Sequence, residues 1–406
     1  MRIRSITIFV HPRWPVNRLA LQKVGIFAQQ AQAAFTKAGY EVQTLRLATP
    51  PFPSFLSPQD YVGSVTGMEV LAHSEGFEYI SLGPASPGED AAFKAIPDML
   101  ANSGILFLSG CMTTPDEKIS LPAVHACAQV IHQSASLEKD GFANLRFAAL
   151  ANVPPWAPFF PAAYHQGKAP AFGLALEAAD LAVTAFKTAD SLADARAKLI
   201  ASIESHAKVL EEQANILAST YGFEFKGIDF TLAPFPNQET SIGRALELLG
   251  LPAVGLSSSL AAAAFLTDTL DRASFIRTGF NGLMLPLLED STLAQRGAEG
   301  VLSVTDLLLY STVCGTGLDT LPLPGDTSVE QLEAILLDVA ALALRLNKPL
   351  TARLMPIPGK KAGDPTGFNF EFFANSKVLE VPAQPLTGLL AGDEEISIKP
   401  RSIYRN

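Results

Sequence analysis

Cys314 is the first candidate for chemistry. It stands in VCGTGLDTLPLPGDT, residues 313–327, between an apolar segment and a run of glycines, prolines and aspartates. Gly315 and Gly317 allow the positive φ of a tight turn, so we expect the thiol to be displayed at a loop tip. There it could act as a nucleophile or proton donor if nearby cations or helix ends lower its pKa. The alternative is a small buried hydrophobic side chain, since free cysteine is among the most buried residue types.

Two aspartates accompany this cysteine, at positions 319 and 326. Carboxylates at this spacing could ligate a divalent cation or orient a substrate hydroxyl. Asp326 lies just before the helix predicted from Val329, where Thr327 or Ser328 would form a capping box, so capping or a turn is its favoured role. Asp319 has no helix beside it and is therefore the better functional candidate.

Three cations occur in RLMPIPGKKAGDPTGF, which begins at position 353. Arg353 alternates with apolar residues in a predicted strand and can point inward. Lys360 and Lys361 follow in a Gly/Pro loop at the C-terminal end of that strand, where ligands of β/α folds bind. In a chain of net charge −10, such a group can hold a carboxylate or phosphate. The alternative is a solvated loop, with Arg353 paired to a core carboxylate.

Other polar residues are weaker candidates for substrate binding or catalysis. Asp229 lies in the hydrophobic run GIDFTLA, where an unpaired charge is costly, so it must be paired, capping or facing a polar interior. Ser257 and Ser258 stand at the predicted start of a helix; they could help to bind an anion, but ordinary N-capping is favoured. His165, at the end of FFPAAYH, is the preferred general-base candidate, ahead of His11.

Metal and cofactor motifs do not stand out in the sequence. The three cysteines have no CxxC and no metal-ligand spacing, no histidine pair has zinc-site spacing, and no GxGxxG follows a predicted strand. The pattern predicts no metal site and leaves any cofactor unknown. Reduced thiols in the cytoplasm are the simplest interpretation of the cysteines.

The elements that must position these residues form two series around a helical middle. In the first half, residues 1–152, short apolar runs alternate with helical segments, which predicts a parallel sheet covered by helices. A helical connecting region, 153–220, opens with the Pro-rich stretch VPPWAPFFPAAYH. The five strands expected in the first half are 4–10, 41–47, 80–83, 105–110 and 145–151.

The alternation resumes in a second half, residues 221–385, so the whole chain is expected to form one α/β domain. A polar peripheral tail, 386–406, follows. The five strands expected in the second half are 227–233, 251–256, 282–288, 351–357 and 376–382.

Composition excludes several classes of protein. Hydrophobic residues make up 48% of the 406 residues and charged residues 17%, enough for a large core. The net charge of −10 argues against nucleic acid and anionic membranes as partners. The most apolar long segment, 329–346, carries four charges, too many for a membrane span. The apolar run that ends at Val10 indicates a first strand rather than a signal peptide.

Three long stretches carry a family resemblance: GFNGLMLPLLEDSTLAQR, LLLYSTVCGTGLDTLPLPGD and KPLTARLMPIPGKKAGDPTGF. The segments FFPAAYH, GLALEAADLA and GIDFTLAPFP fit the same pattern. The sequence resembles the family called domain of unknown function 711, also known as uncharacterised protein family 0210. The resemblance covers most of the chain and is densest from about 150 to 370.

That family resembles the pyruvate formate-lyase group in fold. The resemblance implies a ten-stranded β/α barrel, in which two five-stranded parallel halves run antiparallel to each other. It also implies a hairpin finger loop inside the barrel, near 312–326, with Cys314 at its tip. One departure is that the Arg-Val-x-Gly motif of glycyl radical enzymes is missing from PLTGLLAGDEE near the C-terminus. Glycyl radical chemistry is therefore not supported.

The leading functional hypothesis is a cytoplasmic enzyme that acts on a small anionic metabolite inside the barrel. Cys314, Asp319 and His165 would be its catalytic candidates, and Arg353, Lys360, Lys361, Asp229, Ser257 and Ser258 its substrate-binding candidates. The alternative is a non-catalytic metabolite-binding or regulatory protein, which the missing radical motif favours. An ordinary eight-stranded barrel would require two of the expected strands to be misread. Substrate, reaction and oligomeric state, including a homo-oligomer, stay open.

Overall fold

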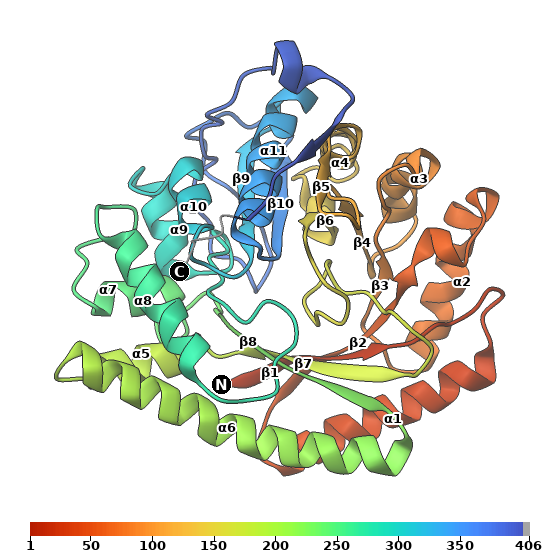
Figure 1. Cartoon of the computed structure of the whole chain (residues 1–406), viewed down its shortest axis with the longest axis horizontal. Helices are drawn as coiled ribbons and strands as arrows, with labels where there is room; N and C mark the ends of the chain where they lie inside the picture. Colours follow the sequence, from red (N-terminus) through yellow and green to blue (C-terminus); the bar gives the residue numbers. More distant parts are fainter. Residues whose placement is uncertain (401–406) are drawn as a thin grey trace, which may run out of the picture.

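A computed structural model describes residues 1–400, and nine strands form one sheet (Figure 1). Five strands from the first half of the chain lie at its centre, and two later strands flank them on each side. In spatial order the strands are β8 (Glu224–Ala233), β7 (Ala171–Glu177), β1 (Arg2–Phe9), β2 (Val42–Pro51), β3 (Tyr79–Gly83), β4 (Leu106–Cys111), β6 (Phe147–Ala151), β10 (Leu350–Ile357) and β9 (Gly317–Pro324).

The strand directions divide this sheet into two sets. The five central strands are parallel to one another, which confirms the predicted parallel sheet of the first half. β7 and β10 pair antiparallel with the two ends of this set, and β8 and β9 are parallel to β7 and β10. Figure 1 shows the sheet strongly curved, with the helices on its outer side and loops on its inner side.

The two edge strands, β8 and β9, both contact the segment 276–288. Arg277 forms an isolated bridge with Ile228 of β8, and Pro286 forms one with Asp319 of β9. The expected strand over 282–288 is therefore absent, and in the described part of the chain the sheet does not close into a ten-stranded barrel. Pro286 has no N–H to donate to a ladder, which disfavours regular pairing there.

Other strand predictions also differ from the structure. Segments 251–256 and 376–382 form no strand, whereas β7 and β9 were not predicted. β9 contains Pro322 and Pro324, which made it resemble a loop, but an edge strand tolerates proline because one side of it needs no donors. β7 lies in the region predicted to be a helical connection, where its apolar, alanine-containing sequence continues into a helix.

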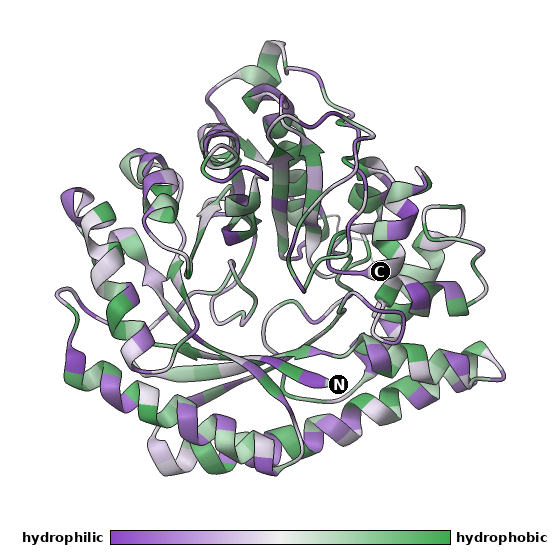
Figure 2. Ribbon diagram, turned by 180° about the vertical axis from the view of Figure 1, so that it is seen from behind, coloured by the Kyte–Doolittle hydropathy of each residue, from purple (hydrophilic) through white to green (hydrophobic). Residues whose placement is uncertain are grey.

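Eleven α-helices are described within residues 1–400: α1 (Arg18–Lys37), α2 (Tyr61–Ser74), α3 (Asp90–Ala101), α4 (Leu121–Ser134), α5 (Ala179–Lys187), α6 (Leu192–Tyr221), α7 (Ile242–Leu248), α8 (Ser259–Arg272), α9 (Ser291–Ala298), α10 (Val304–Tyr310) and α11 (Val329–Leu346). Hydrophilic and hydrophobic residues alternate along the long outer helices α1 and α6 (Figure 2). In α6 the stripe that includes Leu199, Ile203 and Leu210 is buried, as predicted. Within residues 1–400, no helix has both the length and the apolar character needed to cross a bilayer.

Short elements complete the fold. Four 3₁₀ turns are described, η1 (Phe52–Ser54), η2 (Pro58–Asp60), η3 (Phe142–Arg146) and η4 (Gly388–Ala391). In the predicted peripheral tail, β11 (Glu395–Ser397) pairs antiparallel with β5 (Lys118–Ser120) and so fastens the tail to the first half. The remainder of that tail, 401–406, lies outside the described residues.

The Pro-rich stretch 153–165, here called the inner loop, lies against the inner side of the sheet. Hydroxyls of Thr7 in β1 and Ser81 in β3 donate hydrogen bonds to the carbonyls of Pro158 and Ala163, at 3.1 and 2.8 Å. Thr278 similarly donates to the carbonyl of Trp156. The inner loop has little backbone pairing of its own, and wall side chains satisfy its carbonyls.

Candidate functional site

A pocket of about 100 Å³ lies where the inner face of the sheet meets the inner loop. Side chains from β1, β2, β3, β4, β7 and β10 converge on it. We call it the arginine pocket, because three arginines, Arg4, Arg46 and Arg353, line it with Glu289. The aromatic side chains that line it are Tyr79, Phe107, Phe159, Phe160, Phe370 and Phe372.

Two of the three arginines are held by buried carboxylates. Arg353 Nη2 donates to Glu289 Oε1 at 2.8 Å, and Arg353 Nε donates to Asp319 Oδ1. Arg4 pairs with the other oxygen of Glu289. Glu289, Asp319 and Arg353 are each at most 3% exposed, so these ion pairs are shielded from solvent.

The pKa values of this cluster follow from burial and charge. Burial alone would raise the pKa of Glu289, but Arg4 and Arg353 lower it below its usual value. Burial opposes protonation of Arg353, but Asp319 and Glu289 raise its pKa. Both groups are therefore held in their charged forms.

Arg46 in β2 differs, because no carboxylate pairs with it within residues 1–400. Its Nε donates to the hydroxyl of Thr44 at 2.8 Å. Its guanidinium lies over the rings of Phe160 and Tyr79, with centroid distances of 5.1 and 5.6 Å. Burial, reinforced by the positive charge of Arg4, lowers the pKa of Arg46 to about 9. A half-buried cation is thus held mainly by aromatic faces and one neutral hydroxyl.

A second donor in this region also lacks a partner. Arg4 Nη1 is buried, and in the described part of the chain it has no hydrogen-bond acceptor. Buried polar groups are nearly always hydrogen-bonded, so an unmatched guanidinium nitrogen beside an uncompensated guanidinium points to an absent acceptor. What the two groups share is an unmet requirement for a negatively charged oxygen.

Among the predicted site residues, Asp319 and Arg353 are brought together, and Arg353 points inward as its alternation indicated. The predicted alternative, a pairing of Arg353 with a core carboxylate, is also present. Arg4, Arg46 and Glu289 were missed. Arg4 and Arg46 lie in strands that were predicted, and the same alternation argument that selected Arg353 could have selected them.

Cys314 does not occupy the predicted position. It is 1% exposed and lies in the turn between α10 and β9, so the prediction of a displayed thiol at a loop tip is wrong. Gly315 packs against the backbone of Gly282, an approach that a Cβ atom would prevent. Lys348 donates to the Cys314 carbonyl and so fixes the turn. The glycines thus serve close packing, and Cys314 does not line the arginine pocket.

The other two predicted cations, Lys360 and Lys361, lie in the loop after β10. Lys361 is exposed, Lys360 is half-buried, and neither lines the arginine pocket. The backbone N–H of Lys361 donates to Asp364, which stabilises a local turn. The three predicted cations therefore do not form one site, because the strand carries Arg353 inward while the loop turns outward.

Asp229 organises a turn instead of lining the arginine pocket. Its carboxylate accepts hydrogen bonds from the backbone N–H groups of Phe280 and Asn281, at 2.9 and 3.0 Å. Burial raises the pKa of Asp229, and these donors oppose the shift. Of the serines, Ser258 is the N-cap of α8 with a positive φ of 80°, and its side chain makes no capping bond. Both Ser257 and Ser258 are exposed.

His165 ends the inner loop and is buried. Burial, with smaller contributions from His11 and Lys226, lowers its pKa to about 4, so the imidazole is neutral at pH 7. Neither ring nitrogen has a hydrogen-bond partner in the described part of the chain. Its backbone N–H donates to the carbonyl of Thr49 at the end of β2. His165 does not line the arginine pocket.

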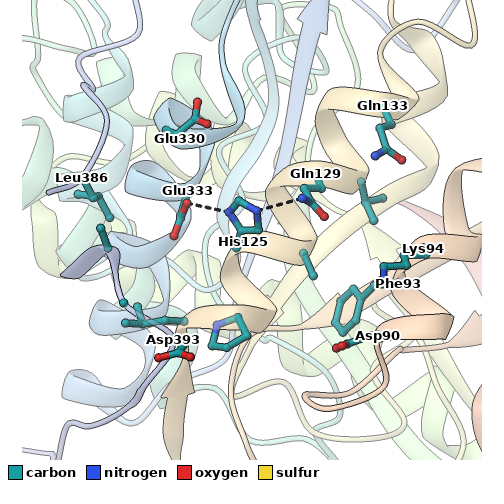
Figure 3. Close-up of a pocket in the computed structure, with 16 residues that line it drawn as sticks. Asp90, Phe93, Lys94, His125, Gln129, Gln133, Glu330, Glu333, Leu386 and Asp393 are labelled. Atoms are coloured by element: carbon teal, nitrogen blue, oxygen red, sulfur yellow. Dashed lines mark hydrogen bonds and ion pairs between the residues drawn. The ribbon is translucent and has the colours of Figure 1, made fainter. Parts of the chain in front are cut away.

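A larger cavity of about 650 Å³ opens between α3, α4, α11 and the segment 386–393 (Figure 3). We call it the outer groove. His125 points into it; its Nδ1 lies 3.0 Å from Glu333 Oε2, and its Nε2 lies 3.0 Å from Gln129 Nε2. Because the Gln129 amide donates, His125 Nε2 must accept and Nδ1–H must donate to Glu333. Both ring nitrogens of His125, the histidine of the outer groove, therefore already have hydrogen-bond partners within the protein.

Clusters of metal ligands are not found in residues 1–400, where no three His, Cys, Asp or Glu side chains are placed to hold a metal ion. The three cysteines are free thiols. The arginine pocket is lined by cationic donors and aromatic rings, groups that are able to hold an anion.

The fold and pocket define an α/β protein whose curved mixed sheet surrounds a buried cationic site. The chain belongs to the family described as Uncharacterised ACR (DUF711), whose model matches residues 1–371. A UPF0210 protein of Pyrobaculum aerophilum is 30% identical over 359 residues, covering 81% of this chain and 76% of the relative. A UPF0210 protein of Syntrophobacter fumaroxidans is 29% identical over 380 residues, covering 87% and 82%. These relatives confirm the family resemblance; their names assign no reaction.

Proposed function

We propose that this protein binds a small anionic metabolite in the arginine pocket. The observation that carries the proposal is Arg46, a half-buried guanidinium without a carboxylate partner in the described residues. Arg4 and Arg353, its neighbours, are paired with Glu289 and Asp319. An anion from solution would supply the missing counter-charge.

The energetics favour this interpretation. A buried charge without a partner is costly, and proteins keep such groups mainly where a ligand completes them. The rings of Phe160 and Tyr79 lie near the Arg46 guanidinium, and its terminal nitrogens make no hydrogen bond to a described residue. A carboxylate or phosphate oxygen can accept such in-plane hydrogen bonds with charge assistance.

Catalysis on the bound anion is the second candidate. The phenol of Tyr79 lines the pocket, and its hydroxyl makes no hydrogen bond to another described residue. It is therefore the side chain best placed to exchange a proton with a bound molecule. Cys314 and His165, the nucleophile and base first considered, do not line this pocket.

We also propose a relation to the pyruvate formate-lyase-like barrel. Five parallel strands followed by four strands of opposite direction support it, with segment 276–288 bridging both edges in the position of a tenth strand. In this proposal the inner loop, 153–165, takes the place expected for a finger loop at 312–326. The free thiols and the acidic charge support a cytoplasmic protein with small-molecule rather than nucleic-acid partners.

The test is a thermal-shift and calorimetric screen of small anions against the wild-type protein and Arg46→Gln. The matched control is Lys361→Gln, which removes one positive charge from an exposed loop. We expect at least one anion to bind wild type and Lys361→Gln equally and to bind Arg46→Gln at least about tenfold more weakly. Equal binding to all three proteins would place the anion elsewhere and reject the proposal.

A further inference from the structure

We propose that the anion of the arginine pocket is a small monocarboxylate with a flat apolar body. This inference rests on the proposed function and narrows it to one ligand class. Three features of the pocket carry it: its net charge, its free guanidinium donors and its aromatic walls.

The charge of the pocket matches a monoanion. Three guanidiniums, Arg4, Arg46 and Arg353, line the pocket with one carboxylate, Glu289, and Arg353 also pairs with Asp319 outside the lining. Three positive charges and two carboxylates leave one positive charge without a carboxylate. A monocarboxylate neutralises this charge, whereas a dianion such as hydrogen phosphate would leave a buried negative charge.

The free polar groups of the pocket are almost all guanidinium donors. Gln43 donates to Glu177 at 2.7 Å, and the hydroxyl of Thr44 donates to the carbonyl of Arg4 at 2.8 Å. Those side chains are already engaged. The donors left among the described residues are Arg4 Nη1, Arg353 Nη1, the terminal nitrogens of Arg46 and the hydroxyl of Tyr79. Together they suit the two oxygens of one carboxylate.

The remaining wall is aromatic. Phe107 contacts the rings of Tyr79 and Phe160 edge-on, with centroids 5.3 and 5.4 Å apart. Phe370 and Phe372, from the segment after β10, line the same pocket, and their rings lie 5.2 Å apart. Rings from the sheet, the inner loop and this segment therefore line the pocket together with its arginines. Aromatic walls of this kind favour flat apolar groups in the ligand.

The size of the pocket limits the ligand further. Its volume of about 100 Å³ is far below that of sites for drug-sized ligands. A ligand with a single ring or a short unsaturated chain suits this space.

The experiment compares four probes by calorimetry: benzoate, its neutral analogue benzamide, the non-planar cyclohexanecarboxylate and inorganic phosphate. We expect benzoate to bind the wild-type protein. Benzamide should bind at least about thirtyfold more weakly because it cannot accept charge-assisted bonds. Cyclohexanecarboxylate should bind about fivefold more weakly because it cannot pack flat against the rings. Phosphate should show no competition with benzoate.

Two variants test whether benzoate binds in the arginine pocket. Arg46→Gln should abolish the preference for benzoate over benzamide, and Phe160→Leu should reduce the preference for benzoate over cyclohexanecarboxylate while it preserves the charge preference. Lys361→Gln should behave as wild type. Unfolding curves of each variant confirm that it is folded before binding is measured.

Failures of the two proposals are distinguishable. If phosphate binds through Arg46 more tightly than benzoate, or if the planar and non-planar acids bind equally, the ligand class is wrong and the anion site stands. If neither of the carboxylates nor phosphate binds in an Arg46-dependent manner, both the ligand class and the proposed function are overturned.

Discussion

The arginine pocket and the outer groove differ in a way that size does not reveal. The outer groove has a volume of about 650 Å³ and the arginine pocket only about 100 Å³. In the outer groove, however, His125 is satisfied on both ring nitrogens by Glu333 and Gln129. In the arginine pocket, Arg4 and Arg46 retain donors without acceptors among residues 1–400. Donors without acceptors among the residues that line a pocket, rather than its volume, are our reason for placing the proposed anion site in the arginine pocket.

The two sites also differ in electrostatic shielding. The side chain of His125 is 44% exposed, so water screens its interaction with Glu333. The carboxylates of Glu289 and Asp319 are 3% and 0% exposed, so their ion pairs operate at low dielectric. The same substitution should therefore have very different effects in the two places.

Glu289→Gln should have the largest effect, because it leaves Arg4 and Arg353 without the carboxylate they share. We expect the free energy of unfolding to fall by about 3–5 kcal/mol, measured by urea denaturation. The matched change in the outer groove, Glu333→Gln, should cost about 1 kcal/mol or less, since a neutral amide can still accept from His125. Equal losses from the two changes would contradict the contrast in shielding.

The next largest expected effect is the change of benzoate affinity with pH. Burial and Arg4 lower the pKa of Arg46 to about 9, so its charge is complete at pH 7 and is lost as the pH rises through that value. Benzoate stays ionised throughout, so its affinity should be constant from pH 6 to 8 and then fall about tenfold per pH unit above the pKa of Arg46. Affinity that stays constant to pH 10.5 would show that Arg46 does not supply the charge.

Arg46→Met should stabilise the ligand-free protein, in contrast to the loss expected for Glu289→Gln. Removing a half-buried charge that has no carboxylate partner relieves its desolvation penalty, and methionine fills much of the same volume. We expect a gain of about 1 kcal/mol in the free energy of unfolding at pH 7. A loss of more than 1 kcal/mol would mean that Arg46 is needed for the fold itself.

His125→Ala should have the smallest effect. Its partially exposed pair with Glu333 contributes little to stability, so the free energy of unfolding should change by less than about 1 kcal/mol. Binding of benzoate should be unchanged. A large loss of benzoate affinity in this variant would connect the outer groove to the arginine pocket and weaken the distinction between them.

The sequence predicted the strands of the first half well, because each is a short apolar run between helices. It also placed Arg353 on the inner face by alternation. It could not predict that Arg4 pairs with Glu289, since residues 285 positions apart are joined only by the fold. The same limit applied to Asp319, whose candidacy rested on loop composition although its role depends on Arg353.

The errors at Cys314 and β9 have one physical origin. Glycine and proline near residues 315–324 were taken as signs of an exposed loop. In the structure, Gly315 allows two backbones to approach closely, and the prolines lie in an edge strand. Composition alone does not distinguish a displayed turn from a tightly packed one, because the same residues permit both.

The strand order also bears on how the protein is made. β6 ends at Ala151, but its outer neighbour β10 begins at Leu350. About 200 residues must therefore be added before that edge is covered, which takes roughly 10–40 s at ordinary rates of translation. During this interval a nascent chain with a folded first half presents an unpaired β6 edge, the kind of edge on which aggregation begins. Synthesis, rather than the finished fold, is therefore the stage at which we expect this edge to be most open to pairing with another chain.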